Sequence, residues 1–583
     1  MEEIFLMITA KDHFTGLLFD LWDHIGPKRR KLLDRSWSGV FRKFLLHELP
    51  IERIARHFTE YSGRPSKELY AMVGTLILQQ AHDLSDEETQ RALAFNLDWH
   101  YALDITDDSD ASTYISERTF RNYRRIILDE GLAPLIFGEL TDRLVKKFGV
   151  DTSKQRMDST HIQSNMRKLG RARLFATTIR KFLRKLARLC PEVFCTSLTK
   201  ELTDRYLAKN SDSCFSRVKP SEVSRTLSQV SQDLLLLVQS FSAHDTIPKM
   251  PEYQMLERVL REQCTVTGSG SEAKVAVKPP KEVSPDSLQN PSDQDAGYDA
   301  HKGQGYQAQF METRQTGERD PKVPNLITYV EVEPAHKHDS PALQPALDAT
   351  TERGCCPEQL ACDTHYGSDD NVLKALEKGV VVIAPVAGPA PAEGITLANF
   401  SADTQTGHIT RCPEGHAPLT MRQTKKHRLI ATFCKKTCQT CPRQGHCPVL
   451  LEKKAAYLRY DLPALRCACR RAWEQTPEFK EEYRWRSGIE GTNSQFKSQL
   501  GGDRLRVRGM ESVRLVVTFK ALGLNIFRCA RALAARLSHA LDSITRFGQK
   551  KTTYSLLVIV LVYQLQVILH KNTASSPKIH CAA

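Results

Sequence analysis

The stretch YRWRSGIEGTNSQFK constrains this chain more than any other segment. It places Tyr483, Arg486, Glu490 and Lys497 at offsets of 0, 3, 7 and 14 residues. At about 100° per residue, one α-helix would bring all four side chains within about 60° of one another. A carboxylate among cations and a phenol on one helix face suits a metal-bound phosphate backbone. The alternative is a solvated helix that carries scattered charges.

Composition favours a nucleic-acid partner. The chain has 583 residues, and its 82 Lys and Arg outnumber its 68 Asp and Glu, which gives a net charge of +14 and a pI near 9.0. Such a surplus favours a polyanion. The mean hydropathy of −0.40 predicts a soluble protein, and the length allows several domains. Sixteen unevenly spaced cysteines and a start without a signal-peptide pattern predict a cytoplasmic location.

The first 150 residues have the pattern of a helical domain. Amphipathic stretches are found around residues 68–78, 86–93 and 116–125, and the last of these has a basic face. Short helices that end in a basic helix are typical of a helix-turn-helix DNA-binding unit. A plain helical bundle with a charged exterior is the alternative.

Beyond residue 150 the pattern becomes that of an α/β sheet. Residues 154–162 predict a short strand with Asp158 towards its end. Further strands are predicted at 305–312, 325–332, 359–363 and 380–383, with helices between the later ones. This alternation indicates a sheet covered on its faces by helices.

Two insertions are expected in this sheet. The first spans about 165–290 and is mainly helical. Its residues 165–191 hold nine Lys or Arg and no acid, so this amphipathic helix would lie on phosphates, a membrane surface or an acidic partner. Residues 267–295 are predicted to be a linker or surface loop. The second insertion, 385–475, contains one CxxC pair with flanking cysteines, and a structural Zn²⁺ site or free thiols are the alternatives for Cys434, Cys438, Cys441 and Cys447.

Two aspartates are candidates to join Glu490. Asp158 and Asp363 each end an apolar stretch and lead into small polar residues. A single aspartate in this position is usually a turn or cap residue, so the hypothesis depends on the set of three. Three carboxylates without histidine or sulfur ligands suit Mg²⁺ or Mn²⁺, and two such ions can clamp a phosphodiester.

At these residues the chain resembles the DDE transposases of bacterial insertion sequences. The similarity is to the branch whose last acid lies in a Tyr-x2-Arg-x3-Glu-x6-Lys signature, which the stretch from residue 483 to 497 fits at every position. MDSTHIQSNM around Asp158 and ACDTHYGSDDN around Asp363 are similar to the segments of the first two acids. The resemblance covers roughly residues 45–535.

The resemblance implies a ribonuclease H-like α/β fold, a mixed sheet flanked by helices, formed from residues 151–384 and 476–540. Residues 1–150 would bind DNA ends, and 541–583 would form a tail. Asp158, Asp363 and Glu490 would bind two Mg²⁺ or Mn²⁺ ions. The enzyme would cleave DNA at the element ends and transfer the 3′-hydroxyl into target DNA, working as a homodimer in a synaptic complex and without a membrane. The implied contacts with DNA phosphates are made by Tyr483, Arg486, Lys497, Arg506 and Arg508.

Two other functions use the same residues. A metal-dependent nuclease without strand transfer would need the same three acids. A decayed transposase would only bind DNA, although clustered acids repel phosphate and offer nothing to such a protein. The apolar run 555–569 has fifteen residues, fewer than the roughly 20 that a membrane span needs, and predicts a buried terminal element.

Overall fold

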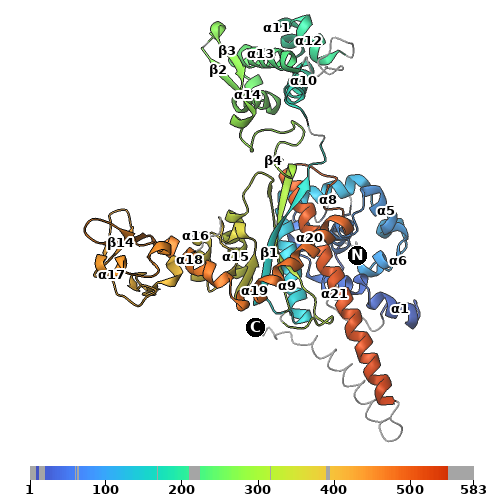
Figure 1. Cartoon of the computed structure of the whole chain (residues 1–583). Helices are drawn as coiled ribbons and strands as arrows, with labels where there is room; N and C mark the ends of the chain where they lie inside the picture. The colour runs from blue at the N-terminus through green and yellow to red at the C-terminus, as the bar shows by residue number, and fades with distance from the viewer. Residues whose placement is uncertain are drawn as a thin grey trace, which may run out of the picture.

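A computed structural model of the chain describes residues 8–11, 20–59, 61, 65–166, 169–208, 223–268, 270–315, 317–388 and 394–548. A central mixed sheet lies between helices, and two inserted units project away from it in different directions (Figure 1). The apolar run 555–569 and most of the expected tail lie outside these residues. Among the described helices, none is long and apolar enough to cross a membrane.

The N-terminal region is helical, as predicted. The helices expected near residues 68, 86 and 116 are α4, α5 and α8, and serine side chains cap the last two. Ser85 and Glu88 form a reciprocal capping box at the start of α5, which satisfies two backbone amides that the helix leaves free. The helices are α1 (Pro27–Asp34), α2 (Trp37–Phe44), α3 (Ile51–Ala55), α4 (Leu69–Ala81), α5 (Asp86–Phe95), α6 (Leu97–Ala102), α7 (Asp110–Thr113), α8 (Glu117–Asp129) and α9 (Leu132–Phe148).

The central sheet confirms the predicted ribonuclease H-like α/β class. Its order is β6-β5-β1-β7-β8, with the short β4 also paired to β5. The pairs β6-β5 and β5-β1 are antiparallel, whereas β1-β7 and β7-β8 are parallel. The strands are β1 (Lys154–Gln163), β4 (Gly297–Asp299), β5 (Gly303–Thr313), β6 (Ile327–Pro334), β7 (Gln359–Cys362) and β8 (Val381–Ile383).

Helices cover both faces of the sheet. Met157 of β1 and Met311 of β5 pack with α15 (Leu343–Glu352) on one face. The neighbouring residues on the other face, such as Phe310, belong to the large core shared with the N-terminal helices and α21 (Met510–Gly548). The α16 helix (Asp369–Glu377) links β7 to β8. This alternation puts Asp158, which is paired with Phe310, on the side of the C-terminal helices.

The first insertion stands apart from the central sheet in Figure 1 and has a hydrophobic core of its own. The basic helix is α10 (Arg171–Leu189), and its apolar face is buried against α13 (Val223–Phe241) and α14 (Pro251–Gln263). The prediction of a linker or loop at 267–295 is wrong in part, because β3 (Lys274–Val277) pairs with β2 (Cys264–Thr267) as a hairpin. Val275 and Val277 pack against the insertion core, which stabilises a strand that the Gly- and Pro-rich composition hides. Two short helices complete the unit, α11 (Pro191–Ser197) and α12 (Lys200–Leu207).

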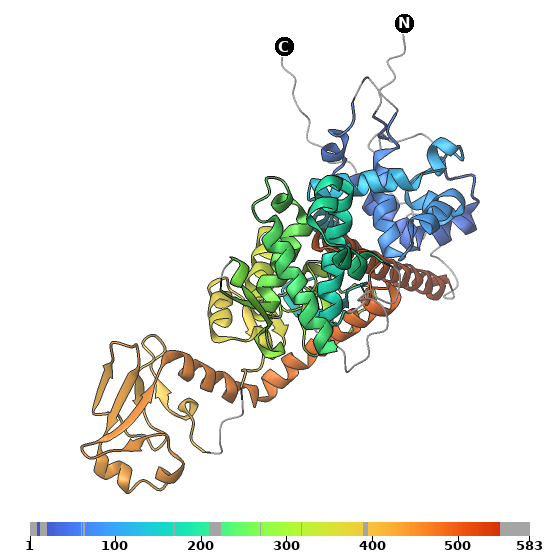
Figure 2. The same cartoon turned by 90° about the horizontal axis from the view of Figure 1, so that it is seen from above.

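The second insertion is built on a four-stranded antiparallel sheet of order β11-β12-β14-β13. Phe433 and Leu458 lie in its small core. The chain returns to the central sheet through α18 (Leu462–Glu474), which is drawn in orange in Figure 2. The other elements are β9 (Ser401–Ala402), β10 (Ile409–Arg411), β11 (Thr420–Gln423), β12 (Leu429–Phe433), α17 (Lys435–Gln439), β13 (Leu450–Leu451) and β14 (Ala456–Tyr460).

The segment expected as one helix from residue 483 to 497 is divided. It consists of α19 (Pro477–Tyr483), the 3₁₀ turn η10 (Arg484–Ser487) and α20 (Gly488–Gln499). At the turn, the carbonyl oxygen of Trp485 accepts a hydrogen bond of 2.9 Å from Arg156 Nη1. This tertiary contact competes with regular helical pairing, which the local spacing could not predict.

Candidate active site

Strand register brings the two predicted aspartates together. In the parallel pair β1-β7, Met157 lies opposite Cys362, and an aspartate follows each of them. Asp158 stands in the middle of the ten-residue β1, so the expectation that it lies towards the strand end is wrong. It does stand where the ladder shared with β7 ends. Asp363 turns out of β7 and accepts a hydrogen bond of 2.5 Å from the amide of Thr364.

The guanidinium of Arg486 lies among the three predicted acids. Its Nη2 is 3.2 Å from Asp158 Oδ2 and 4.0 Å from Asp363 Oδ2, and its Nη1 is 3.0 Å from Glu490 Oε1. Burial would lower the pKa of Arg486, but the carboxylates of Asp158 and Asp363 raise it above its usual value. The side chains of Asp158, Asp363 and Glu490 are 15, 37 and 63 % exposed, so the cluster opens from β1 towards solvent.

Asp158 is the least exposed acid of the cluster, and its pKa is raised above the usual value. Burial raises its pKa, Arg486 partly offsets this, and the nearby charges of Asp363 and Asp339 raise it further. Asn493 Nδ2 lies 3.3 Å from Asp158 Oδ2. Sequence reasoning missed Asn493, although its position three residues after Glu490 places it on the same helix face. Asp339 lies directly before a 3₁₀ turn, and nothing in the local sequence indicates that it lies near Asp158.

The other predicted DNA contacts separate into two groups. Tyr483 stacks on Phe479 with ring centroids 5.4 Å apart. Burial raises the pKa of Tyr483, the charge of Arg486 opposes this rise, and the charge of Asp363 adds to it. Lys497 is close to His161, whose pKa is lowered by burial and by the charges of Lys302 and Lys497.

Two predicted contacts lie in the loop between α20 and α21. Arg506 Nη1 donates to the carbonyl of Asp83 in the N-terminal region at 2.6 Å. Arg508 Nη1 lies 3.3 Å from Met166 Sδ. Within the described part of the chain, neither side chain makes a hydrogen bond or ion pair with the three acids.

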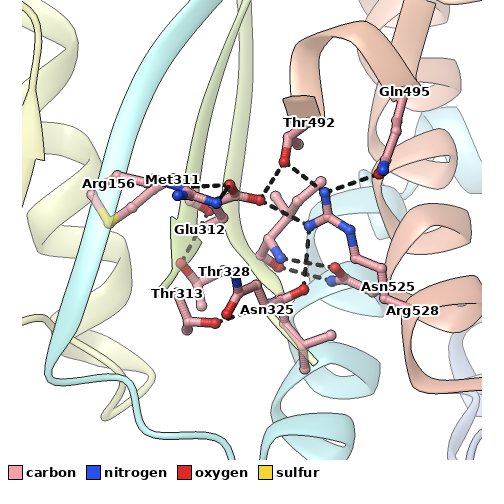
Figure 3. Close-up of polar contacts among 12 residues, drawn as sticks. Arg156, Met311, Glu312, Thr313, Asn325, Thr328, Thr492, Gln495, Asn525 and Arg528 are labelled. Carbon is pink, nitrogen blue, oxygen red and sulfur yellow. Dashed lines mark hydrogen bonds and ion pairs between the residues drawn. The ribbon is translucent and has the colours of Figure 1, made fainter. Parts of the chain in front are cut away.

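A buried carboxylate, also missed by sequence reasoning, fixes α20 to the sheet (Figure 3). Glu312 of β5 is fully buried and lies 2.7 Å from Arg156 of β1 and 2.8 Å from Arg528 of α21. Thr492 Oγ1 of α20 donates to it at 2.6 Å. Burial would raise the pKa of Glu312, but Arg528 and Arg156 hold it below its usual value. These four residues, the Glu312 network, join two strands and two helices.

The network also explains Gly488, which lies within the signature stretch between Arg486 and Glu490. A Cβ at Gly488 would overlap the guanidinium of Arg156. Arg156 needs this space because it bonds both Glu312 and the carbonyl of Trp485. Gly488 therefore lets the first turn of α20 lie directly on the buried arginine, on the side of the helix away from Glu490.

The three acids are chemically suited to a hard divalent cation. Carboxylate oxygens are preferred ligands of Mg²⁺ and Mn²⁺. As the side chains stand, no group of three or more His, Cys, Asp or Glu residues in the described ranges is arranged to hold a metal ion. Around the acids, Arg486 lies between the carboxylates and supplies the positive charge.

Five cysteines of the second insertion line one cavity. Burial raises the pKa of Cys438 to about 11, and the nearby Cys447 and Cys412 add to this rise. Cys434 differs, because hydrogen bonds from Thr437 lower its pKa. A Zn²⁺ site remains a prediction. Cys412 also lines the cavity, although it was not among the predicted zinc ligands. The cysteines of this cavity are Cys412, Cys434, Cys438, Cys441 and Cys447.

Two family comparisons match the chain. Residues 411–530 match a family described as a transposase DDE domain, and residues 34–125 match one described as a transposase domain (DUF772). The chain carries a transposase DDE domain. The first match contains Arg486, Glu490 and most of the second insertion, whereas the second match covers α2 to α8. No curated protein matches the chain. A transposase DDE domain implies an enzyme that cleaves DNA, and proteins of this family bind DNA and in general use divalent metal ions.

Proposed function

We propose that this transposase cleaves DNA at the ends of its element and joins the freed 3′-hydroxyl to target DNA, with Asp158, Asp363 and Glu490 as its catalytic carboxylates. One observation carries the proposal, namely that acids from β1, the end of β7 and α20 surround the arginine of the same signature. These acids are far apart in sequence. Bringing three like charges to one point costs free energy, which is a common property of functional sites.

The three carboxylates would hold two Mg²⁺ or Mn²⁺ ions. Such ions activate the attacking oxygen and stabilise the leaving oxygen of a phosphodiester. Asn493 would orient the Asp158 carboxylate through its amide nitrogen. The Glu312 network would hold α20 in place, so that Glu490 is presented at a fixed position relative to β1.

The cations of the signature would bind the DNA backbone. Phosphate oxygens accept the same charge-assisted hydrogen bonds that Arg486 now makes with carboxylates. Transfer of Arg486 from the acids to a phosphate would therefore free the acids as metal ligands. Tyr483 and Lys497 would contact neighbouring phosphates. Arg506, Arg508 and the N-terminal helices would bind further along the element end, in a homodimeric synaptic complex.

The test is an integration assay with linear DNA carrying the element's own ends and a target plasmid, with Mg²⁺ or with a chelator. Wild type is expected to give joined products only with Mg²⁺. Glu490→Gln is expected to lose cleavage and keep near-normal end binding, because it removes a metal ligand and no phosphate contact. Glu511→Gln is the matched control, because Glu511 is also an exposed helical acid paired with an arginine.

Each other outcome has a definite meaning. Cleavage within a few-fold of wild type in Glu490→Gln would remove this residue from the site. Cleavage by wild type without joined products would favour a plain nuclease. End binding without any cleavage would favour a decayed transposase that only binds DNA.

A further inference from the structure

A second basic site lies behind α20. A cavity of about 860 Å³ is enclosed by η10, α20, α21 and the loop from β5 to β6. At about 100° per residue, its lining residues Gly488, Thr492 and Gln495 lie about 140–160° around α20 from Glu490. The cavity is therefore on the opposite side of this helix from the three acids. We call it the arginine pocket, for its lining residues Arg156, Arg314, Arg319, Arg484, Arg528 and Arg531.

The charge of the arginine pocket is strongly positive. Glu312 is the one acid among its described lining residues, and Arg314 and Arg484 also pair with Glu482 and Glu481 beside the pocket. The Glu312 carboxylate is already bound by Arg156 and Arg528 in the Glu312 network. In the described ranges, Arg319 and Arg531 form no ion pair or hydrogen bond, and both are exposed at the pocket. A concave site with this excess of cations concentrates field lines and attracts anions.

An unsatisfied buried donor points independently to a ligand. Arg314 is only 3 % exposed, and its Nη2 pairs with Glu482, but its Nε has no hydrogen-bond partner among the described residues. Its guanidinium lies over the Trp485 ring, 5.9 Å from the ring centre, and Arg484 lies 5.0 Å from the same ring. A buried guanidinium N–H without an acceptor is costly, and a ligand oxygen in the pocket would satisfy it.

These features select a phosphate-bearing strand as the ligand. Arginine forks match phosphate oxygens, and an indole ring offers a surface on which a base can stack. The volume is in the range of pockets that hold small ligands, which suits one or two nucleotides of an unpaired strand and is too small for a duplex about 20 Å across. We propose that the arginine pocket binds an unpaired DNA strand, with phosphates on Arg319, Arg531 and Arg314 and a base against Trp485. This inference rests on the proposal that the chain acts on DNA, and does not depend on cleavage.

The test measures binding in a chelating buffer, where no cleavage is needed. The full chain is titrated into a labelled unpaired strand of about 12 nucleotides between about 50 and 200 mM salt, with fluorescence anisotropy as the readout. The double variant Arg319→Ala/Arg531→Ala is expected to lose about tenfold in affinity, since two charge-assisted contacts are removed. Its salt slope is expected to fall by about 1.4, which is two contacts at roughly 0.7 each.

A matched variant separates this site from general charge. Arg411→Ala/Arg422→Ala removes the same charge from two exposed arginines of the second insertion and is expected to change the affinity less than twofold. All four side chains are exposed, so the fold is retained. Equal losses in the two double variants, or no loss in either, would overturn the proposal.

Trp485 gives a direct signal for the ligand. The unpaired strand is expected to quench tryptophan emission in wild type and much less in Trp485→Phe. A duplex of the same length or inorganic pyrophosphate alone is expected to quench little. Quenching by pyrophosphate but not by the strand would overturn the assignment to DNA. A chain that binds the strand here but never cleaves DNA would refute the proposed function and leave this inference standing.

Discussion

Replacement of one buried carboxylate tests how the site is held. Glu312→Gln keeps the size of the side chain but removes its charge and replaces one acceptor oxygen with an amide donor. Arg156 and Arg528 then remain with side chains only 9 and 13 % exposed and no opposing charge. Breaking a buried ion pair in this way costs about 3–5 kcal/mol. Since Thr492 and Arg528 join α20 to Glu312, we expect this cost in the free energy for opening α20.

Hydrogen exchange of α20 amides measures that free energy. A cost of about 3–5 kcal/mol predicts exchange that is about 150 to 5,000 times faster than in wild type. Glu331→Gln is the control, because Glu331 lies on the neighbouring strand β6 and pairs with Arg514 of the same helix α21, but at the surface. A surface pair contributes at most about 1 kcal/mol, so exchange should rise less than about fivefold.

The pH dependence supplies a second criterion. The pKa of Glu312 is lowered on folding, so the folded state binds fewer protons. Its stabilisation is present above the ordinary pKa near 4.5 and is lost as the pH falls through the folded value. The difference between wild type and Glu312→Gln should therefore shrink below about pH 4.5. Equal exchange in the two glutamine variants at neutral pH would refute the reasoning.

Three further predictions concern Gly488, Arg486 and the cysteine cavity. Gly488→Ala should destabilise the protein by about 1–3 kcal/mol in thermal unfolding, because the added methyl group displaces Arg156. Gly491→Ala is the control and should be neutral or stabilising, because the space at its Cβ is open. Equal effects of the two substitutions would contradict the packing argument. Arg486→Ala should weaken binding to duplex element ends and reduce the salt slope by about 0.9, and an unchanged slope would mean that it contacts no phosphate. A structural Zn²⁺ site at the cysteine cavity predicts one Zn²⁺ per chain in purified protein, measured by elemental analysis, and its loss in Cys438→Ser; metal-free folded protein would rule the site out and leave free thiols.

Local pattern was sufficient for much of the fold and for the composition of the site. Helical spacing placed Arg486 and Glu490 together, and they are 3.0 Å apart despite the intervening 3₁₀ turn. The core strands were predictable because alternating and β-branched runs are short-range signals. The convergence of Asp158 and Asp363 with Glu490 was inferred from the family resemblance, since nothing in the local sequence brings three distant segments together.

Tertiary structure alone decided the remainder. A glutamate in the strand GQGYQAQFMET gives no sign that it is fully buried, and only the register of β1 against β5 places Arg156 opposite Glu312. The arginine pocket likewise takes its lining from segments hundreds of residues apart. Residue spacing encodes which face of one element a side chain occupies, because that depends on local backbone geometry. Which faces then meet, and which charges they bury together, is set by packing across the whole chain.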